Sequence, residues 1–509
     1  MLCSIYKFLT ETLWGQAFVS ILAAIAFFTL DLFGLRTLSN SYSRNLFIPI
    51  VAPFYPAEGQ RHVTTVIVDD AAAEEMAERY PIGLSEHGRL LRRMLCEGPS
   101  VIVVAVAFRY LRDGDAGVEG LKSQLLFRRI DGGCRQVTPG EAREGQALDA
   151  QGQLRPVTKV LLAASSGAGG RCVPFSAAIA DECVEARKID SLKQVAEPVD
   201  FARTTLDNSY LLWRPLVKDG PLVPSPAVRA FAAFCERVGR ALATCAAPLL
   251  VDDATLVTHW GLYPPQLQAK LSDATGHMRP DAPCLGAHGQ PADRIGQLRD
   301  VARVVLRLAR LNGLGNMDEE PIEKHPSCRY TSEINAALLF SRPNGDPLLS
   351  EALRDRVVVY GIEIAGIRDD ELVPIFGRVP GAHFNAMVID NLISFGNAYK
   401  REPAQITVGR LKVSALNLIE LAWTSVLILV ATWLAAPGFS TSTGLCGGPR
   451  LITPTSLAYY AFVAASVCAI VYLVVFVWNW PAPNVIGVLS VKAFDAGTRS
   501  ARPGKVQRS

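Results

Sequence analysis

The sequence has almost no excess charge of either sign, and it has few histidines. Its 509 residues include 51 Lys and Arg against 48 Asp and Glu, a formal net charge of +3 at pH 7. Nucleic-acid binding depends on neutralising many phosphates, so we expect no nucleic-acid partner. The sequence also lacks a nucleophile elbow, a P-loop and a His-Glu-x-x-His motif, and its 7 His are scattered. We therefore predict a protein that is not an enzyme and that holds no metal and no cofactor.

Three long apolar stretches dominate what the sequence does contain. Leu13–Leu30 and Leu457–Trp480 have no charged residue, and Val413–Ala436 is interrupted only by Glu420. A helix needs about 20 mostly apolar residues to cross a bilayer. The pattern predicts three transmembrane helices, one before and two after a large polar block; buried core helices are the alternative.

These stretches divide the chain into a membrane frame and one large domain. We expect an amino-terminal anchor over 1–36, a folded domain over 37–410 with inserts near 111–200 and 264–330, transmembrane helices over 411–437 and 456–480, a short loop over 438–455, and a basic tail over 481–509. A cleaved signal peptide is the alternative for the first stretch. An uncleaved anchor is favoured, because the apolar run is long and no small-x-small cleavage site follows it.

The polar block has the pattern of an α/β domain. His62–Val68 alternates β-branched residues, and Ser100–Phe108 is a continuous apolar run typical of a buried strand. Between them, Ala71–Arg79 and Glu86–Cys96 have helical periodicity. This order of strand, helices and strand favours a parallel or mixed sheet. Arg356–Gly361 is predicted as a further buried strand.

A basic amphipathic helix is predicted over Ile295–Leu311. Leu298, Val301, Val305 and Leu308 recur on one face, and the arginines lie mostly on the opposite one. Two interpretations remain open: a solvated surface helix, or a helix that docks on a membrane or on an acidic partner.

Three blocks of sequence lie in order within this frame. The first is Val66-Ile-Val-Asp-Asp-Ala71, followed by Tyr80-Pro81 and Val101–Phe108. The second is Trp213-Arg-Pro-Leu-Val217, followed by Pro224-Ser-Pro-Ala-Val228. The third is Val358-Val-Tyr-Gly361, Ala365-Gly366, Asp369, Pro374, Pro380-Gly381 and Ala386–Leu392. Together, over roughly residues 44–400, they resemble the CHASE2 family of extracytoplasmic sensor domains.

The resemblance implies a sensory α/β domain outside the cytoplasm. In the family such a domain is usually coupled through membrane helices to a cyclase, kinase or diguanylate-cyclase output. Only 29 residues follow Trp480, so we expect the effector to be a separate protein. The predicted location is the bacterial inner membrane, as a multi-pass protein with a periplasmic domain. The positive-inside rule opposes this orientation, because most basic residues near the apolar stretches then lie outside.

The cysteines agree with an oxidising compartment. Eight of the 11 Cys lie in the polar block, and an even number fits a set of disulfides. Cys96 and Cys235 lie on apolar helix faces, where a free buried thiol is the commoner state. We leave disulfide formation open and expect these two to be free thiols.

Acidic residues follow two of the predicted strands and are candidate ligand-binding residues. Asp69 and Asp70 end the first strand, where ligands bind in open α/β sheets; capping of the next helix is the alternative. Glu363, Asp369 and Asp370 follow the Arg356–Gly361 strand. If the two strands are neighbours, these five carboxylates converge, as a ligand site or as a structural ion cluster.

Three further residues complete the predicted ligand site. Arg214 is the expected counter-charge for the carboxylates. His383 and Asn385 come from the resemblance, because family members carry a histidine at the position of Asn385, and His383 lies two residues earlier.

Asn417 and Glu420 lie inside the second apolar stretch. A carboxylate within a membrane usually pairs with another group or marks function. We predict a polar contact to a partner helix; a solvated position at the headgroup level is the alternative.

The sequence thus predicts a membrane-bound sensory protein that passes a ligand or partner signal through its helices to a separate effector. The alternative is a structural or assembly subunit of an envelope complex, with the domain as a protein-binding platform. A homodimer is left open.

Overall fold

The structure is a computed structural model. It describes residues 12–30, 35–76, 82–106, 114–163, 190–199, 209–215, 222–251, 255–274, 294–314, 329–364, 370–373, 375–401, 403, 405–408, 411–434, 454–485 and 488. The chain forms two compact units: residues 48–400, the domain, and residues 1–47 with 401–509, the helical unit. The domain is therefore slightly shorter than the predicted 37–410.

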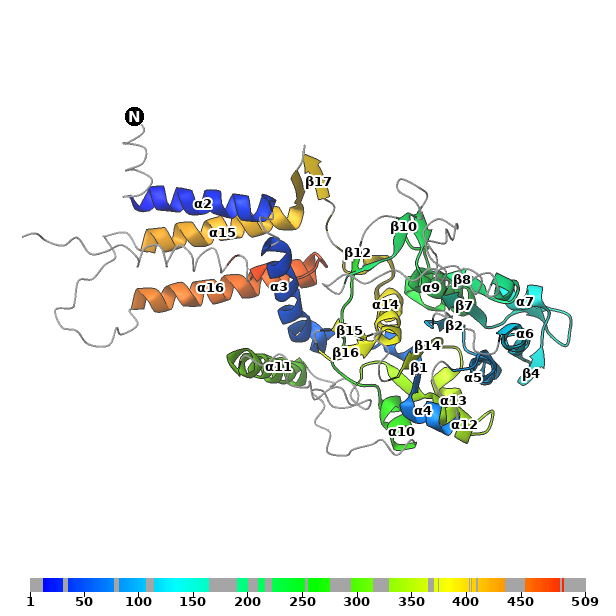
Figure 1. The fold of residues 1–509 in the computed structure, drawn as a ribbon. Helices are drawn as coiled ribbons and strands as arrows, with labels where there is room; N and C mark the ends of the chain where they lie inside the picture. Colours follow the sequence, from blue (N-terminus) through cyan, green and yellow to red (C-terminus); the bar gives the residue numbers. More distant parts are fainter. Residues whose placement is uncertain are drawn as a thin grey trace, which may run out of the picture. The chain divides into compact units, whose positions relative to one another are not determined.

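A six-stranded sheet forms the centre of the domain (Figure 1). In spatial order its strands are β13 (Ser332–Asn335), β1 (Val63–Asp69), β14 (Val357–Glu363), β2 (Val101–Val104), β7 (Lys159–Ala163) and β8 (Glu197–Val199). Every pairing is parallel. The predicted α/β class is confirmed.

The spatial order of the strands differs from their order along the chain. β1 and β2 both pair with β14 and not with each other. β7 and β8 both come from residues 111–200, the region predicted as an insert. That region therefore supplies one side of the sheet. The sequence does not predict these short strands, because Gly- and charge-rich segments surround them.

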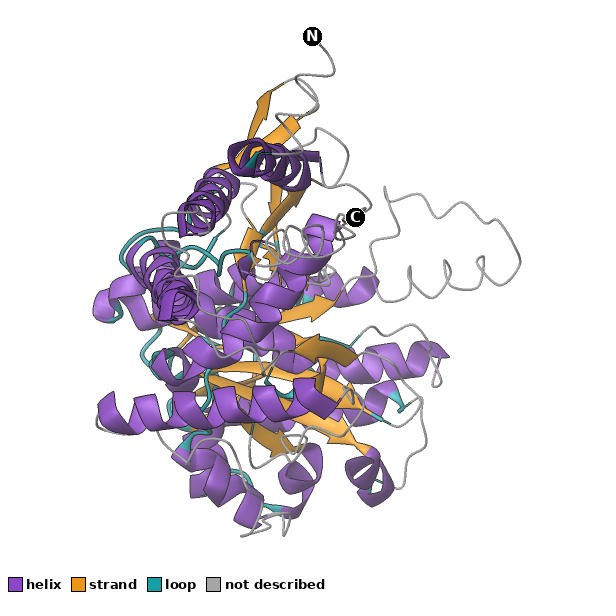
Figure 2. Ribbon diagram, turned by 90° about the vertical axis from the view of Figure 1, so that its left-hand side faces the viewer, coloured by secondary structure: helices purple, strands orange, loops and turns teal. Residues whose placement is uncertain are grey.

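Helices cover both faces of the sheet, as Figure 2 shows. On one face lie α5 (Leu84–Glu97), α6 (Gly114–Gln124), α12 (Ala336–Ser341) and α13 (Pro347–Leu353); on the other lie α9 (Pro226–Val238) and α14 (Gly381–Phe395). Alternate strand residues belong to separate cores because successive strand side chains point to opposite faces. Val63 and Ile67 thus pack with α9 and α14, while Val66 and Val68 pack with α5.

Shorter elements surround the sheet. Two-stranded antiparallel ladders join β3 (Phe127–Ile130) to β4 (Gly133–Gln136), β5 (Gln146–Leu148) to β6 (Leu154–Pro156), β9 (Ser209–Leu211) to β12 (Thr255–Val257), β10 (Trp213–Pro215) to β11 (Leu222–Pro224), and β15 (Asp370–Val373) to β16 (Gly377–Pro380). The remaining α-helices of the described domain are α4 (Asp70–Glu75), α7 (Pro139–Glu144), α10 (Gln266–Ala274) and α11 (Arg294–Leu314).

Two disulfides correct the expectation of free thiols at Cys96 and Cys235. Cys96 of α5 is bonded to Cys134 of β4, with Cα atoms 5.0 Å apart. Cys235 of α9 is bonded to Cys245, with Cα atoms 5.2 Å apart. Cys134 lies on β4, which packs on α5, and Cys245 follows Cys235 by 10 residues, after the end of α9. Neither pairing leaves a periodic signal in the sequence.

The helical unit consists of α2 (Leu13–Leu30), most of α3 (Leu35–Val51), the hairpin of β17 (Gln405–Val408) and β18 (Leu411–Ser414), α15 (Ala415–Leu434), α16 (Pro454–Tyr472) and a π-helical turn, η11 (Leu473–Val477). α2 packs along α15 (Figure 1). Two helices in the described part of the chain, at Ala415–Trp433 and Ala458–Val477, are long and apolar enough to cross a membrane. α2 has the bounds of the first predicted span.

Candidate functional site

Polar side chains gather on one face of the sheet, toward the ends of three neighbouring strands. In the register of β1 and β14, Asp69 lies opposite Glu363. In the register of β1 and β13, Thr65 lies opposite Glu333 and Ile67 opposite Asn335. Paired residues on neighbouring strands point to the same face of a sheet, and so does every second residue along a strand. The side chains at these positions therefore share the face covered by α14. β1 and β14 are therefore neighbours, which is the condition under which their acidic residues could converge.

Asp69 has a local structural role. One carboxylate oxygen accepts a hydrogen bond from the Ala72 backbone N–H at 2.8 Å, which makes Asp69 the N-cap of α4. The other oxygen accepts from Asn335 Nδ2 at 2.6 Å. Capping, one of the two interpretations of this residue, is therefore realised, and the second oxygen ties β1 to the edge strand β13.

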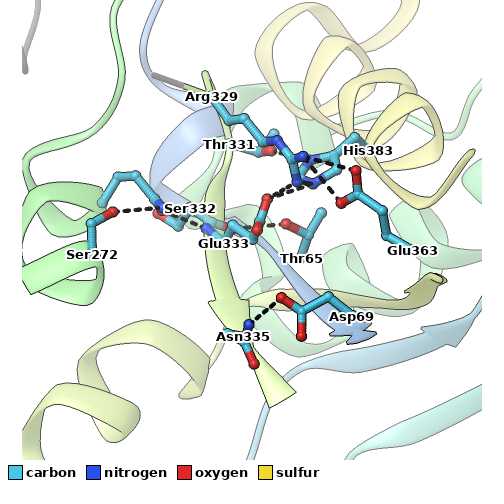
Figure 3. A network of polar contacts seen from close by, with 11 residues as sticks. Thr65, Asp69, Ser272, Arg329, Thr331, Ser332, Glu333, Asn335, Glu363 and His383 are labelled. Atoms are coloured by element: carbon cyan, nitrogen blue, oxygen red, sulfur yellow. Dashed lines mark hydrogen bonds and ion pairs between the residues drawn. The ribbon is translucent and has the colours of Figure 1, made fainter. Parts of the chain in front are cut away.

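Arg329 is the centre of the largest polar network in Figure 3. Its guanidinium donates to Glu333 and, from Nη2, to both carboxylate oxygens of Glu363 at 3.2 and 3.1 Å. His383 joins the network, with Nε2 2.8 Å from Glu333 Oε2 and Nδ1 3.0 Å from Thr331 Oγ1. The arginine side chain is 7 % exposed and the Glu363 side chain 38 %. Glu363 is therefore the member of the network that solvent reaches.

The charges of this network stabilise one another. Burial favours a protonated Glu333, but Arg329 and the hydrogen bond from His383 oppose it and hold the pKa of Glu333 down to about 2. Burial also opposes the charge of Arg329, and the two carboxylates overcome this and raise its pKa. Burial and Arg329 together lower the pKa of His383. At neutral pH Arg329 is therefore a cation, Glu333 is ionised and His383 is a neutral imidazole.

The tautomer of His383 follows from its partners. A proton on Nε2 lets the ring donate to Glu333, and the free Nδ1 then accepts from the Thr331 hydroxyl. The Nη1 atom of Arg329, 2.9 Å from Nε2, then donates to Glu333 instead of to the ring.

A close approach of two backbones positions His383. Gly361 of β14 lies beneath the first turn of α14, and a Cβ atom at Gly361 would lie 2.4 Å from the Cβ of Ala382. A side chain at residue 361 would push the start of α14, and with it His383, away from the sheet.

The other predicted site residues are dispersed. Asp70 is exposed in the first turn of α4. Asn385 points elsewhere on α14: it accepts from the Tyr210 hydroxyl at 3.2 Å and donates to the Gly381 carbonyl at 2.8 Å. Arg214 lies in the β10–β11 hairpin, outside the six-stranded sheet, and its side chain is not described.

Two of the predicted carboxylates are described incompletely or not at all. Asp370 opens β15 opposite Pro380, the residue before α14, and its side chain is not described. Asp369 lies outside the described residues. The counter-charge that the structure places beside Glu363 is Arg329.

Sequence reasoning missed Arg329, Glu333 and Asn335. All three lie in or just before β13, and the sequence of this strand, Ser332-Glu-Ile-Asn335, has no apolar run that would predict a strand. The alternation of polar residues around the buried Ile334 was the available signal.

A second buried carboxyl group lies on α14, the helix that carries His383. Asp390 is fully buried and accepts a 2.6 Å hydrogen bond from the Tyr55 hydroxyl. Its other oxygen, Oδ2, has no hydrogen-bond partner in the described structure. Burial raises the pKa of Asp390 to about 7, against the opposing effect of Tyr55 and Ser394.

The polar residues of the second apolar stretch lie within the helical unit. Asn417 is in the first turn of α15, where its backbone N–H donates to Ser414 Oγ at 3.2 Å. Glu420 is 1 % exposed, and its Oε1 accepts from the Asn484 backbone N–H at 2.6 Å. The Asn484 side chain in turn donates to Ser39 Oγ at 2.7 Å. Glu420 thus joins α15 to the segment after η11.

The described residues contain no group of three or more His, Cys, Asp or Glu side chains arranged to hold a metal ion. The chemistry that the Arg329 network offers is instead hydrogen bonding and charge at one partly exposed carboxylate, Glu363.

The comparisons with known proteins identify the class of the protein. The sequence profile of the CHASE2 domain matches residues 17–432. That match covers the whole domain together with most of α2 and α15. Searches of curated proteins and of solved structures gave no match. The chain belongs to the CHASE2 family of sensor domains.

Proposed function

We propose that this protein is a sensory subunit of the bacterial inner membrane, with its domain in the periplasm and its effector on a separate protein. Family membership supports a sensory role, and the two disulfides fit an oxidising compartment. α2, α15 and α16 are proposed to cross the membrane. The proposal assigns no catalytic step to this chain.

One observation carries the proposal: α14, which carries His383 of the Arg329 network, comes shortly before the proposed membrane helix α15 in the sequence. His383 lies in the first turn of α14, and the elements described between α14 and α15 are η10 (Gly396–Ala398) and the β17–β18 hairpin. A ligand that binds Glu363 competes with Arg329 for that carboxylate. It can bias the position of α14 only if it binds two arrangements with different affinity.

The alternative is an envelope scaffold whose domain binds other proteins. It is favoured by the completeness of the network, in which Arg329 is paired with both Glu333 and Glu363. Under this alternative the network only stabilises the fold.

A reporter fusion tests the orientation. Alkaline phosphatase fused after Arg401 is active only outside the cytoplasm, so the proposal requires an active fusion. A silent phosphatase, together with an active cytoplasmic reporter at the same position, would reverse the orientation.

Purification from native membranes in mild detergent, followed by mass spectrometry, tests the role. Stoichiometric recovery of a kinase, a cyclase or another cytoplasmic effector is the expected result. In that complex, Glu363→Gln should abolish the response of the effector while the subunits still co-purify. Recovery of envelope components alone favours the scaffold.

A further inference from the structure

The outer face of α11 carries apolar and basic residues together. Ile295 is 77 % exposed and Leu298 58 %. Ala302 is exposed on the same side of the helix, since residues 295, 298 and 302 lie within one narrow sector at 100° per residue. Arg299 and Arg303 are exposed along one border of this sector and Arg294 along the other.

The opposite face of α11 holds the helix on the domain. Gly296, Asp300 and Val304 are buried there. Val304 belongs to the core that includes α9 and α14. Asp300 accepts a hydrogen bond from the Tyr263 hydroxyl at 3.0 Å.

This placement differs from the amphipathic pattern of the sequence. Leu298 and Val301 belong to one apolar stripe in the sequence, but Leu298 points away from the domain and Val301 is only partly buried. The domain therefore contacts α11 through a face that includes Gly296 and a carboxylate. The described apolar side chains Ile295 and Leu298 are left on the outside.

We propose that this outer face of α11 lies on the surface of an anionic membrane. An apolar stripe bordered by arginines is the pattern of helices that bury their apolar side at the headgroup boundary, and the arginines complement anionic lipid charge. α11 also contacts η2 (Ala52–Phe54), where the chain enters the domain after α2 and α3, and Phe54 of η2 is 37 % exposed. The inference rests on the membrane attachment proposed above, but not on the Arg329 network.

The test uses the full chain in lipid nanodiscs with a photoreactive residue, Leu298→p-benzoylphenylalanine. Leu154 on β6, 66 % exposed and remote from α11 in sequence, is the matched control position. We expect cross-links to phospholipid at position 298 and not at 154. The yield should be higher with phosphatidylglycerol present than with phosphatidylcholine alone, and it should fall with added salt.

The double variant Arg294→Gln/Arg299→Gln should lower the lipid cross-link about fivefold for each arginine removed. Its thermal unfolding should match that of the parent, because neither side chain has an ion pair in the described structure. Equal lipid yields at positions 298 and 154, or cross-links from 298 to a second copy or another protein, overturn the proposal. Release of the parent chain from membranes by alkaline carbonate would instead mean that the proposed attachment fails.

Discussion

Two buried carboxyl groups, Glu333 of β13 and Asp390 of α14, have pKa values shifted in opposite directions. Glu333 packs beside Arg329 and His383, and its pKa is held at about 2. Within the described residues, the carboxyl group of Asp390 has the hydroxyl groups of Tyr55 and Ser394 as hydrogen-bond partners, and its pKa rises to about 7. Burial alone favours the neutral acid in both places. A cation within hydrogen-bond distance reverses the effect, so the arginine sets the charge at the start of α14.

The largest expected effect comes from removing that cation. Arg329→Met leaves Glu333 buried without a positive partner and should lower the free energy of unfolding by about 3–5 kcal/mol. Denaturant unfolding of the detergent-solubilised protein, followed by the circular dichroism of the domain, measures it. Arg342→Met is the matched control, since Arg342 pairs with Asp346 at the same i,i+4 spacing but is 40 % exposed; it should cost less than about 1 kcal/mol. Equal losses would mean that Arg329 does not compensate a buried charge.

Asp390 should make the free energy of unfolding fall as the pH rises. Its pKa is raised from 3.8 to about 7 on folding, so its contribution to stability is present below pH 4 and is lost as the pH rises through 7. Asp390→Asn cannot ionise, and it should be increasingly stabilised relative to the parent between pH 5 and pH 8. Melting temperatures of both proteins at each pH test this. A constant difference across the range would contradict an ionising Asp390.

Two substitutions of Asp69 distinguish its helix-capping role from its negative charge. Asp69→Ala removes the N-cap of α4 and the bond from Asn335, and should cost about 1–2 kcal/mol in unfolding free energy. Asp69→Asn can still cap the helix and should cost less. Chemical denaturation of the two variants side by side distinguishes them. Equal losses would show that the charge, and not the cap, is what matters.

Glu363 should have the smallest effect on stability. Its side chain is 38 % exposed, and a partly solvated ion pair contributes little. Glu363→Gln should change the unfolding free energy by less than about 1 kcal/mol. A loss as large as that of Arg329→Met would make Glu363 part of the structural core, and would weaken its assignment as the ligand-contacting residue.

Local patterns predicted the strands but not their neighbours. The apolar runs before Asp69 and Glu363 marked β1 and β14, and the acidic residue after each run could be read directly. The pairing with β13 depends on residues 266 or more positions away, as in the bond between Asn335 and Asp69. Arg214 lies in a sequence block that resembles the family, which favours it as the counter-charge, whereas no such block contains Arg329. The partners of Cys96 and Cys235 lie only 38 and 10 residues away along the chain, but no periodic pattern marks them.

The position of β14 in the sheet has a consequence for synthesis. β1 and β2 are synthesised early but do not pair with each other, because β14 lies between them in the sheet and is synthesised much later. Until β14 emerges, both strands have unpaired edges, which are prone to pair wrongly. The domain therefore completes its sheet only when nearly all of it has been synthesised, shortly before α15. A chain truncated before Val357 would lack the central strand and should be degraded instead of accumulating as a half-domain.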